Sequence, residues 1–477
     1  MSNAHLHDVN HWRERIVGLD ELLPLLDGRL APYINLDNAA STPPFREVVD
    51  AVHHFLPYYS SVHRGTGFKS RLSTMAYDEA HDIVRRFVGA DARTSTVIFV
   101  KNTTEALNKL ARRYPLPKAS VVLSTVMEHH SNDLPWRGRA EVVRAKVTPE
   151  GRLDETDVDR LLAEYGERIA LMTVSGASNV TGFIQPVHRL ARKAHAVGAR
   201  IVVDAAQLAA HRPIDVKPAD SSEHLDYVVL SAHKMYAPFG TGALIGCRDT
   251  FEHGEPEHSG GGTVDIVTPT EVSWAALPDR EEAGSPNVVG AVAMAVAART
   301  LMDAGMESVA RHEDALSAYA FEQVRSVPGV TVYGGDSTGT DNDRLGVVAF
   351  NVGALPHALV AAMLGYEGGI GVRSGCFCAQ QYVSLLLGIE SSERAGWRGR
   401  RDGAHRFTRP GMVRVSLGLY NTRDDIDALV AMLQRIAAGD CRAQYDRVAE
   451  TGDYRPAGYE DALRTYFSAM QEKTPPS

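Results

Sequence analysis

The stretch Ile201-Val-Val-Asp-Ala-Ala-Gln207, followed by the run Tyr227-Val-Val-Leu-Ser-Ala-His-Lys234, decides the fold of this chain. Each is an apolar run of strand length that ends in polar residues, which is typical of buried strands. The carboxyl ends of such strands deliver their residues to one place, so we expect Asp204 and Lys234 to lie close together.

Asp204 and Lys234 are the two protein groups that a pyridoxal phosphate (PLP) coenzyme needs. A carboxylate that closes a buried strand is costly unless a cation or a protonated ring nitrogen meets it. A desolvated lysine loses its proton and forms an imine with an aldehyde. In PLP enzymes the acid keeps the pyridinium nitrogen protonated and the lysine carries the aldehyde. Alternatively, Asp204 could cap the following helix, and Lys234 could be an ordinary exposed lysine at a strand end.

Composition excludes several classes of protein. The chain has 477 residues, 23% of them charged, and a net charge of -9, which argues against a nucleic-acid binder or a partner for anionic membranes. The first ten residues are polar and no apolar run approaches a membrane span, so we expect a cytoplasmic protein. The four cysteines are Cys247, Cys376, Cys378 and Cys441. They are too few and too irregularly spaced for a disulfide framework or a four-ligand zinc site, and we expect no bound metal.

Apolar periodicity alternates between strands and helices along most of the chain. A short strand that runs into small polar residues is predicted within 34–43, and further strands are predicted at 96–100, 121–125, 169–174, 347–351 and 413–416. Helices are predicted at 11–23, 45–59, 74–88, 154–165, 186–197, 289–304, 356–364, 422–436 and 460–471. This alternation predicts an α/β fold with a mostly parallel sheet covered by helices on both faces.

Polar residues gather at the predicted carboxyl ends of the strands, where ligands bind in such sheets. They are Thr103, Thr104, His129, Asn179, Asp204, Gln207 and Lys234. The paired threonines open a helix directly after a strand and suit a phosphate, although helix capping would use the same residues. An imidazole at His129 suits stacking on a planar ring, although histidine pairs in loops are more often polar surface.

Three competing motifs of α/β enzymes are missing from the sequence. There is no phosphate loop of the Gly-x-x-x-x-Gly-Lys-Ser/Thr kind, no Gly-x-Ser-x-Gly nucleophile elbow and no early Gly-x-Gly-x-x-Gly. The sequence therefore argues against nucleotide-binding and serine-hydrolase enzymes.

Many short motifs in one order carry a family resemblance. They are Leu36-Asp-Asn-Ala-Ala40, Val62-His-Arg-Gly65, Thr103-Thr-Glu105, Glu128-His-His130, Ser178-Asn-Val180, Asp204-Ala-Ala-Gln207, Ser231-Ala-His-Lys234, Gly260-Gly-Gly-Thr263, Glu282-Ala-Gly-Ser-Pro-Asn287, Arg373-Ser-Gly-Cys-Phe-Cys378 and Arg414-Val-Ser416. Together they resemble the class V aminotransferases, of PLP fold type I, and within them the group II cysteine desulfurases and selenocysteine lyases.

The resemblance implies a role for each residue. Lys234 forms the internal aldimine, Asp204 pairs with the pyridinium, Gln207 bonds the ring hydroxyl and His129 stacks on the ring as a catalytic residue. The other coenzyme contacts are Thr103, Thr104, Asn179, Ser231 and His233, with Thr263 and Ser285 reaching in from a second subunit of a homodimer. Arg414 clamps the substrate carboxylate, and the remaining substrate contacts are Asn38, His63, Asn179 and Arg373.

The sequence departs from the family at the sulfur-handling loop. Relatives of this group carry Arg-x-Gly-His-His-Cys, whereas Cys376 and Phe377 replace the two histidines here, as in molybdenum-cofactor sulfurases. Cys378 keeps the catalytic position. If 371–378 is extended, Cys376 and Cys378 project from the same side about 6 to 7 Å apart, which suits a relay of sulfur between them. The alternative is that Cys376 is only a small loop residue.

These features lead to one functional hypothesis and one division of the chain. We expect PLP-dependent removal of sulfur from L-cysteine to alanine, with the persulfide on Cys378 and possible transfer to an acceptor protein. The alternatives are a C–S lyase on cystine or a cysteine derivative, an epimerase or an aminotransferase. The expected parts are a helical segment at 1–33, a large PLP-binding domain at 34–304 with a seven-stranded type of sheet, a small α+β domain at 305–440, an Arg-rich mobile surface at 388–410, and a polar tail at 441–477.

Overall fold

A seven-stranded sheet lies at the centre of the computed structural model, which describes residues 9–335, 343–389, 410–449, 451–459, 463 and 467–468. Its strand order is β4-β10-β9-β8-β7-β5-β6. The bounds are β4 Ser95–Val100, β5 Val121–Thr125, β6 Glu141–Ala145, β7 Ile169–Ser175, β8 Arg200–Asp204, β9 Tyr227–Ser231 and β10 Gly242–Cys247. Only β10 runs antiparallel to its neighbours, so the predicted α/β fold with a mostly parallel sheet is confirmed.

Strand β8 shows why the deciding run is apolar throughout. Ile201 and Val203 belong to the hydrophobic core on one face of the sheet, and Val202 belongs to the core on the other face. Side chains alternate along a strand, so a strand covered on both sides has no place for a polar residue until it ends. Asp204 is that end.

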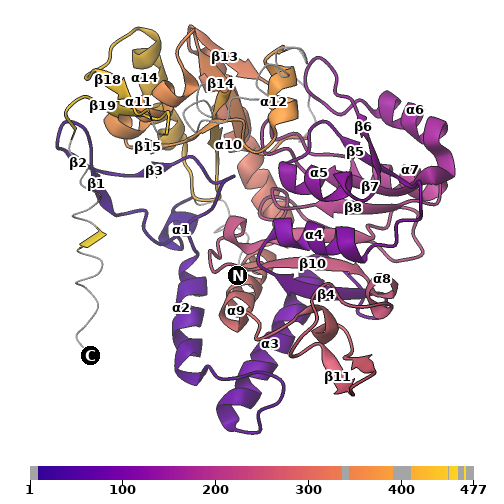
Figure 1. Cartoon of the computed structure of the whole chain (residues 1–477). Coiled ribbons are helices and arrows are strands. Elements are labelled where there is room, and N and C mark those ends of the chain that lie inside the picture. Colours follow the sequence, from indigo (N-terminus) through magenta and orange to yellow (C-terminus); the bar gives the residue numbers. More distant parts are fainter. Residues whose placement is uncertain are drawn as a thin grey trace.

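Helices cover both faces of the large sheet (Figure 1). They are α3 Phe68–Phe87, α4 Thr103–Arg113, α5 His130–Arg137, α6 Glu155–Tyr165, α7 Val187–Ala196, α8 Arg248–Glu252 and α9 Val288–Ala304. Side chains of Asn102, Asp154 and Asn287 cap the amino ends of α4, α6 and α9, which satisfies backbone N–H groups that a helix start leaves open.

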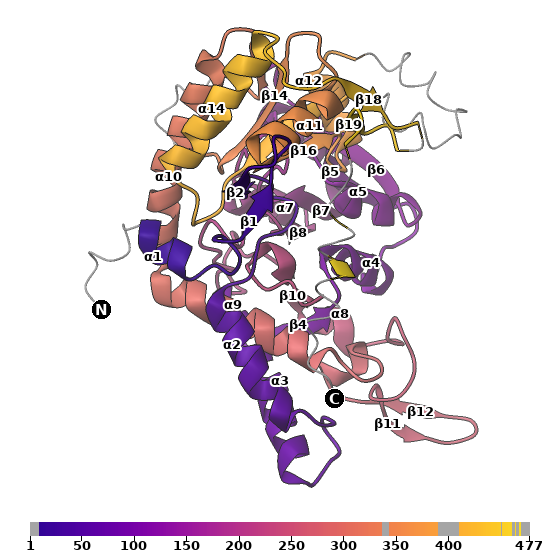
Figure 2. The same ribbon diagram turned by 90° about the vertical axis from the view of Figure 1, so that its left-hand side faces the viewer.

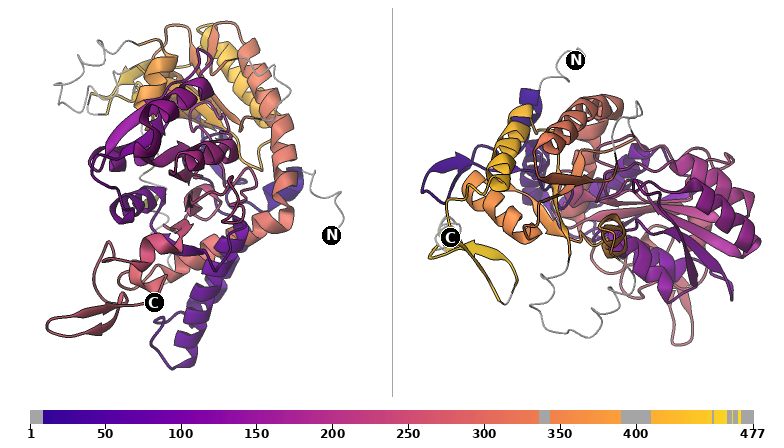
Figure 3. Two further views of the ribbon diagram at one scale, coloured as in Figure 1. Left: turned by 90° about the vertical axis from the view of Figure 1, so that its right-hand side faces the viewer. Right: turned by 90° about the horizontal axis from the view of Figure 1, so that it is seen from above.

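A second, antiparallel sheet has its own core and lies beside the large one (Figures 1 and 3). Its order is β13-β14-β17-β16, with β13 Val330–Tyr333, β14 Val347–Val352, β17 Met412–Ser416 and β16 Arg373–Gly375. The helices α10 Met306–Ser326, α11 His357–Gly368, α12 Gln380–Leu386 and α14 Arg423–Ala437 accompany it, followed by the hairpin β18 Tyr445–Arg447 and β19 Tyr454–Pro456.

The chain passes between these two sheets at two places, near its N-terminus and at the end of α9. β3 Ile34–Asn35 pairs in parallel with β15 Ile370–Gly371, and Leu36 lies in the core of the second sheet. At the second place, α9, which covers the large sheet, is followed after Gly305 by α10, which packs beside the second sheet. Within the described ranges no single helix is long and apolar enough to span a membrane; α9 and α10 meet that test only as a pair bent by 79°.

Two hairpins project from the far end of the molecule, away from the second sheet (Figure 2). One comprises α2 Arg46–Phe55, the turn η2 Leu56–Tyr58 and α3; the other pairs β11 Val264–Val267 with β12 Val272–Trp274. Arg64, between α2 and α3, donates from Nη2 to the carbonyl of Val264 at 3.1 Å, so the two hairpins touch.

The predicted helix at 11–23 is wrong beyond its first turn, residues 11–14. The helix α1 is Val9–Glu14, and β1 Leu22–Pro24 pairs with β2 Leu30–Pro32 instead. Gly18 has a φ of 85°, a left-handed conformation through which an α-helix cannot continue to residue 23. Apart from residues 463 and 467–468, which are helical, the predicted helix at 460–471 lies outside the described residues, as does nearly all of the Arg-rich stretch at 388–410.

Candidate active site

Lys234 and Asp204 lie at adjacent strand ends, as the sequence predicts. Asp204 is the last residue of β8, and Lys234 closes the short turn η4 Ala232–Lys234 directly after β9, the strand paired with β8. Burial lowers the pKa of Lys234 to about 8, although Asp204 favours its charged form. Burial likewise raises the pKa of Asp204 against the effects of the Ala206 N–H and Lys234. Lys234 therefore loses its proton more readily than an ordinary lysine.

Hydroxyl groups surround the first turn of α4 beside this pair. The Ser231 Oγ accepts a hydrogen bond from the Thr103 N–H and donates to the Thr103 hydroxyl, both at 2.9 Å. The exposed Thr104 hydroxyl lies 2.7 Å from that of Ser131. Burial and nearby Lys234 lower the pKa of His233 to about 4, so its ring is neutral. Donors at a helix start suit a phosphate group.

His129 is a neutral ring at the start of α5. Its Nδ1 accepts the Ser131 N–H at 3.1 Å, so we assign the ring proton to Nε2. Burial lowers its pKa to about 3, with further contributions from Lys234, His130 and Arg414. A neutral imidazole next to a lysine can lie against a planar aromatic ring without charge repulsion.

A buried carboxyl group, Glu128, anchors this segment to the sheet. It accepts hydrogen bonds from Thr125 of β5 at 2.7 Å, Asn132 of α5 at 2.6 Å and Ser175 of β7 at 2.7 Å. Burial raises its pKa to about 7 in spite of these donors. Glu128 thus ties the ends of two strands to the helix that carries His129.

Arg414 of β17 is 3% exposed and brings the second sheet into the site. Its Nη2 pairs with Asp37 Oδ1 at 3.0 Å, its Nη1 donates to the Asn179 carbonyl at 2.9 Å, and its guanidinium lies 5.0 Å from the centre of the Phe377 ring. Its Nε is buried without a hydrogen-bond partner among the described residues. An orphaned buried donor costs about 1 to 3 kcal/mol, which a bound carboxylate would recover.

Asp37 is shared between two arginines. Its Oδ2 also pairs with Nη2 of Arg373 at 3.0 Å, and the Arg373 side chain is half exposed. Asp37 therefore keeps a cationic partner if an incoming carboxylate takes its place on Arg414.

Cys378 lies on a tight turn, and the condition that 371–378 is extended holds only as far as Gly375. β16 ends at Gly375, and the Ala379 N–H then bonds to the Cys376 carbonyl at 2.8 Å. Phe377 and Cys378 have φ values of 51° and 55°, a left-handed pair that glycine and asparagine adopt most easily. Alternation along a strand consequently does not place the two thiols on one side.

Neighbouring groups hold this turn in its strained conformation. Asn179 Nδ2 donates to the Phe377 carbonyl at 2.7 Å, and the His130 N–H donates to the Cys378 carbonyl at 2.7 Å. The Cys378 side chain is exposed, and a thiolate there favours the charged forms of both Lys234 and Arg414. Cys376 is half-buried and its thiol donates to the Pro410 carbonyl at 3.5 Å.

Two expected ligand contacts are engaged with the protein itself. Gln207 donates from Nε2 to the Ala39 carbonyl at 2.8 Å. The buried Asn38 donates to the Ser416 carbonyl at 3.0 Å and accepts from the Tyr420 hydroxyl at 2.7 Å. In this structure both side chains hold the segment of Asp37 against β17 and β8.

Three expected site residues lie outside this group. His63 lines a cavity of about 540 Å³ along α3, and its Nδ1 is 3.9 Å from Asp279. Thr263 is buried and its hydroxyl donates to the Gly260 carbonyl at 2.8 Å. Ser285 is exposed. All three belong to the end of the molecule where the two hairpins project.

Residues 34–429 match the family described as Aminotransferase class-V. The chain belongs to this family. It is 36% identical over 428 residues to a cysteine desulfurase of Haloferax volcanii, an alignment that covers 87% of this chain and 92% of that protein. It is 34% identical over 412 residues to a cysteine desulfurase of Pectobacterium atrosepticum, covering 85% and 93%.

Solved structures agree with the class-V assignment. The apo cysteine desulfurase of Thermococcus onnurineus NA1 superposes with a TM-score of 0.74 at 30% identity, covering 85% of this chain and 95% of that one. The Escherichia coli cysteine desulfurase CsdA gives a TM-score of 0.74 at 27% identity, covering 91% and 99%. The chain is therefore an enzyme of the class-V family, whose members depend on PLP.

The residues of this class-V chain fit PLP chemically. A buried acid and a lysine of lowered pKa stand at adjacent strand ends, with a neutral imidazole and the hydroxyls of α4 beside them. Four further residues shape the site, although the family resemblance assigns them no role: Asp37, Glu128, His130 and Phe377. Asp37 and Glu128 each stand beside an assigned residue, which was the available signal.

Proposed function

We propose that this enzyme is a PLP-dependent cysteine desulfurase that converts L-cysteine to alanine and leaves the sulfur as a persulfide on Cys378. The observation that carries the proposal is the exposed Cys378 on a turn that Asn179 and His130 hold beside Arg414 and Lys234. The names of the relatives support it.

The coenzyme would be held by residues at the strand ends. Lys234 would carry its aldehyde, Asp204 its ring nitrogen and His129 its ring face, while its phosphate would lie at the start of α4 near Thr104, Ser231 and His233. When bound, PLP withdraws electrons from the α-carbon of an amino acid. The lowered pKa of Lys234 suits it to accept and return the proton at that carbon.

Substrate binding follows from Arg414. The α-carboxylate of L-cysteine would bond to the orphaned Nε and to Nη2, and Asp37 would then remain paired with Arg373. This places the substrate between the second sheet and Lys234, on the side where Cys378 is exposed.

Sulfur transfer can be written with balanced atoms. The Cys378 thiolate attacks the substrate sulfur, a bond forms between the two sulfurs, and the carbon–sulfur bond of the substrate breaks. The electron pair stays on the substrate carbon, which takes a proton and becomes the methyl group of alanine. The product on the enzyme is a persulfide, which we propose is passed to an acceptor protein.

The decisive experiment measures alanine, pyruvate and sulfide separately after the holoenzyme is incubated with L-cysteine. We expect alanine in the wild type, no alanine in Cys378→Ala with its coenzyme absorbance unchanged, and normal alanine in the control Cys441→Ala. Pyruvate formation that survives Cys378→Ala would overturn the proposal and indicate a C–S lyase, which needs no cysteine.

We also propose a homodimer in which Thr263 and Ser285 reach the coenzyme of the partner subunit. Large apolar side chains are exposed on both projecting hairpins, among them Phe68 and Met75 of α3 and Ile266 and Val267 of β11. Exposed apolar groups gathered at one end of a molecule mark an interaction surface. A partner subunit would also explain why Thr263 and Ser285 lie apart from Lys234 in one chain.

A further inference from the structure

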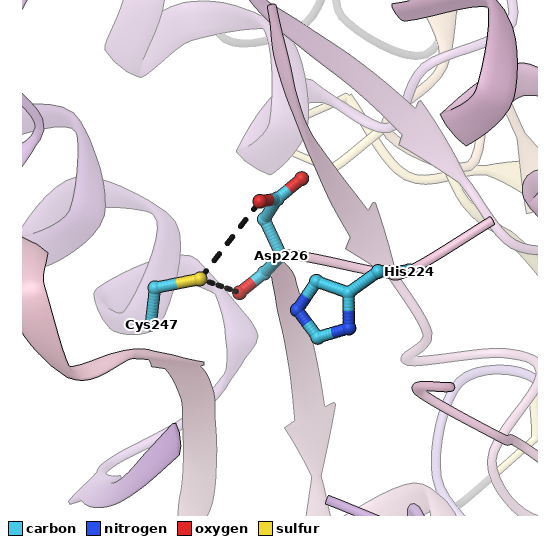
Figure 4. A group of neighbouring side chains, drawn as sticks. All are labelled: His224, Asp226 and Cys247. Carbon is cyan, nitrogen blue, oxygen red and sulfur yellow. Dashed lines mark hydrogen bonds between the residues drawn. The ribbon is translucent and has the colours of Figure 1, made fainter. Parts of the chain in front are cut away.

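Three potential metal ligands meet where strand β9 begins and strand β10 ends, at the opposite end of these strands from the active site (Figure 4). Asp226 directly precedes β9, whereas Lys234 follows its carboxyl end, and Cys247 ends the antiparallel strand β10 at the same edge as Asp226. His224 stands two residues before Asp226. One ligand atom from each of the three residues lies within 4.8 Å of the others.

The carboxylate and the thiol are spaced nearly as in a zinc site, and the ligand atoms of all three residues lie within 4.8 Å of one another. Cys247 Sγ is 3.8 Å from Asp226 Oδ1. In a tetrahedral site with zinc–sulfur and zinc–oxygen distances of about 2.3 and 2.0 Å, these two ligands lie about 3.5 Å apart. A shift of a few tenths of an ångström would therefore bring the carboxylate and the sulfur to bonding distance.

The structure already orients the histidine and the carboxylate. His224 donates from Nδ1 to the Lys217 carbonyl at 2.8 Å, which leaves Nε2 with its lone pair on the side of Cys247 (Figure 4). Asp226 Oδ2 accepts from His195 Nε2 at 2.8 Å and from the Ile201 N–H at 2.9 Å, so Oδ1 faces the thiol. Hydrogen bonds of this kind to the remote atoms of metal ligands fix their orientation.

Two basic groups border the site: His195, whose ring donates through Nε2 to Asp226 and through Nδ1 to the Ser222 carbonyl, and Arg200. Arg200 Nε lies 3.8 Å from Asp226 Oδ1, but its two Nη atoms bond to Asp249, which neutralises it. His224 and Asp226 are buried, whereas Cys247 is half-buried and is the most exposed of the three ligands. The thiol donates to the Asp226 carbonyl at 3.5 Å.

We propose that His224 Nε2, Asp226 Oδ1 and Cys247 Sγ bind one zinc ion, with water as the fourth ligand. On binding, Cys247 releases its proton to solvent and forms a zinc–sulfur bond in place of its hydrogen bond to Asp226. The site joins the loop before β9 to the end of β10, on the far side of the sheet from Lys234. Its role is to stabilise the fold, since it does not contact the reacting groups.

Cobalt(II) tests the site spectroscopically, because a cobalt–thiolate bond gives a charge-transfer band and tetrahedral cobalt gives visible bands. All variants are made in the Cys378→Ala holoenzyme, which is the parent protein, so that the exposed Cys378 thiol cannot bind cobalt. The parent is first freed of metal with a chelator. We expect one equivalent of cobalt with both signals in the parent and in the control Cys441→Ser. We expect loss of the thiolate band in Cys247→Ser and about tenfold or greater weakening in His224→Gln.

A second measurement needs no change at the site. Zinc should slow the alkylation of Cys247 in the parent protein, measured by mass spectrometry of its peptide, while alkylation of Cys441 keeps its rate. Absence of cobalt signals in the parent, a thiolate band that persists in Cys247→Ser, or alkylation of Cys247 that zinc leaves unchanged would each overturn the proposal.

Discussion

The reactivity of Lys234 depends on the balance between burial, which lowers its pKa to about 8, and Asp204, which opposes that change. The amine is mostly charged below this pH and mostly neutral above it. We therefore expect covalent attachment of PLP to coenzyme-free enzyme to quicken about tenfold per pH unit up to about pH 8 and then level off. Stopped-flow absorbance at a series of pH values checks this.

Asp204→Asn provides the matched variant for that pH profile. It removes the carboxylate that favours the charged lysine, so the levelling point should move to lower pH. A wild-type profile that keeps rising toward the ordinary pKa of lysine would contradict the assigned environment of Lys234.

Arg414 gives a second prediction at the scale of one residue. Arg414→Ala should lower kcat/KM for L-cysteine by about 10- to 100-fold, because a charged hydrogen-bonding partner of the carboxylate is worth about 1.5 to 3 kcal/mol. The affinity for PLP should stay unchanged, as measured by titration of the coenzyme-free protein. Arg373→Ala serves as the control with a smaller effect, and equal losses of PLP and substrate binding in Arg414→Ala would count against the clamp.

At the scale of elements, the turn that carries Cys378 depends on the start of α5. The Gln380 N–H donates to His130 Nε2 at 3.3 Å, and burial lowers the pKa of His130 so that this nitrogen remains an acceptor. His130→Ala removes the acceptor, and loss of one such bond should slow alanine formation about fivefold. The coenzyme absorbance should not change, and His130→Gln, which retains an acceptor, should recover part of the rate.

Two results would argue against this role of His130. One is an unchanged rate of Cys378 alkylation in His130→Ala, because a loosened turn must alter the exposure of the thiol. The other is an equal loss of coenzyme, which would show that His130 acts on the PLP site as a whole.

Elements with regular periodicity were predictable, and elements set by distant contacts were not. β5 was predicted to the residue because it is an apolar run with clear ends. β9 begins at Tyr227 as predicted but ends at Ser231, before the predicted run, which extends to Lys234. The turn at Phe377 and Cys378 was not predicted, since neither residue favours a positive φ and its stability comes from Asn179 and His130, far away in sequence. The β1–β2 hairpin was missed because Trp12, Ile16 and Leu19 follow a helical spacing that Gly18 interrupts.

On the scale of the whole molecule, the candidate site exists only where two sheets meet. Lys234 and Asp204 come from the large sheet and Arg414 from the second one, and the bond from Arg414 to the Asn179 carbonyl joins them. Strand ends predict the first pair by the rule for parallel sheets. No local pattern predicts that Asp37 bridges Arg373 and Arg414, because this depends on how β3 and β17 are brought together.

The proposed homodimer leads to a prediction about the projecting hairpins. Phe68 and Ile266 are 75% and 61% exposed on one chain, so a charge at either position is harmless in a monomer but is costly inside an interface. Sedimentation analysis should show a dimer for the wild type and a monomer for Phe68→Asp and Ile266→Asp. Leu30→Asp, at a 59% exposed position on β2 near the second sheet, should remain dimeric. If Thr263 and Ser285 serve the partner's coenzyme, the monomeric variants should also bind PLP more weakly, whereas monomers with unchanged PLP affinity would show that each chain completes its own site.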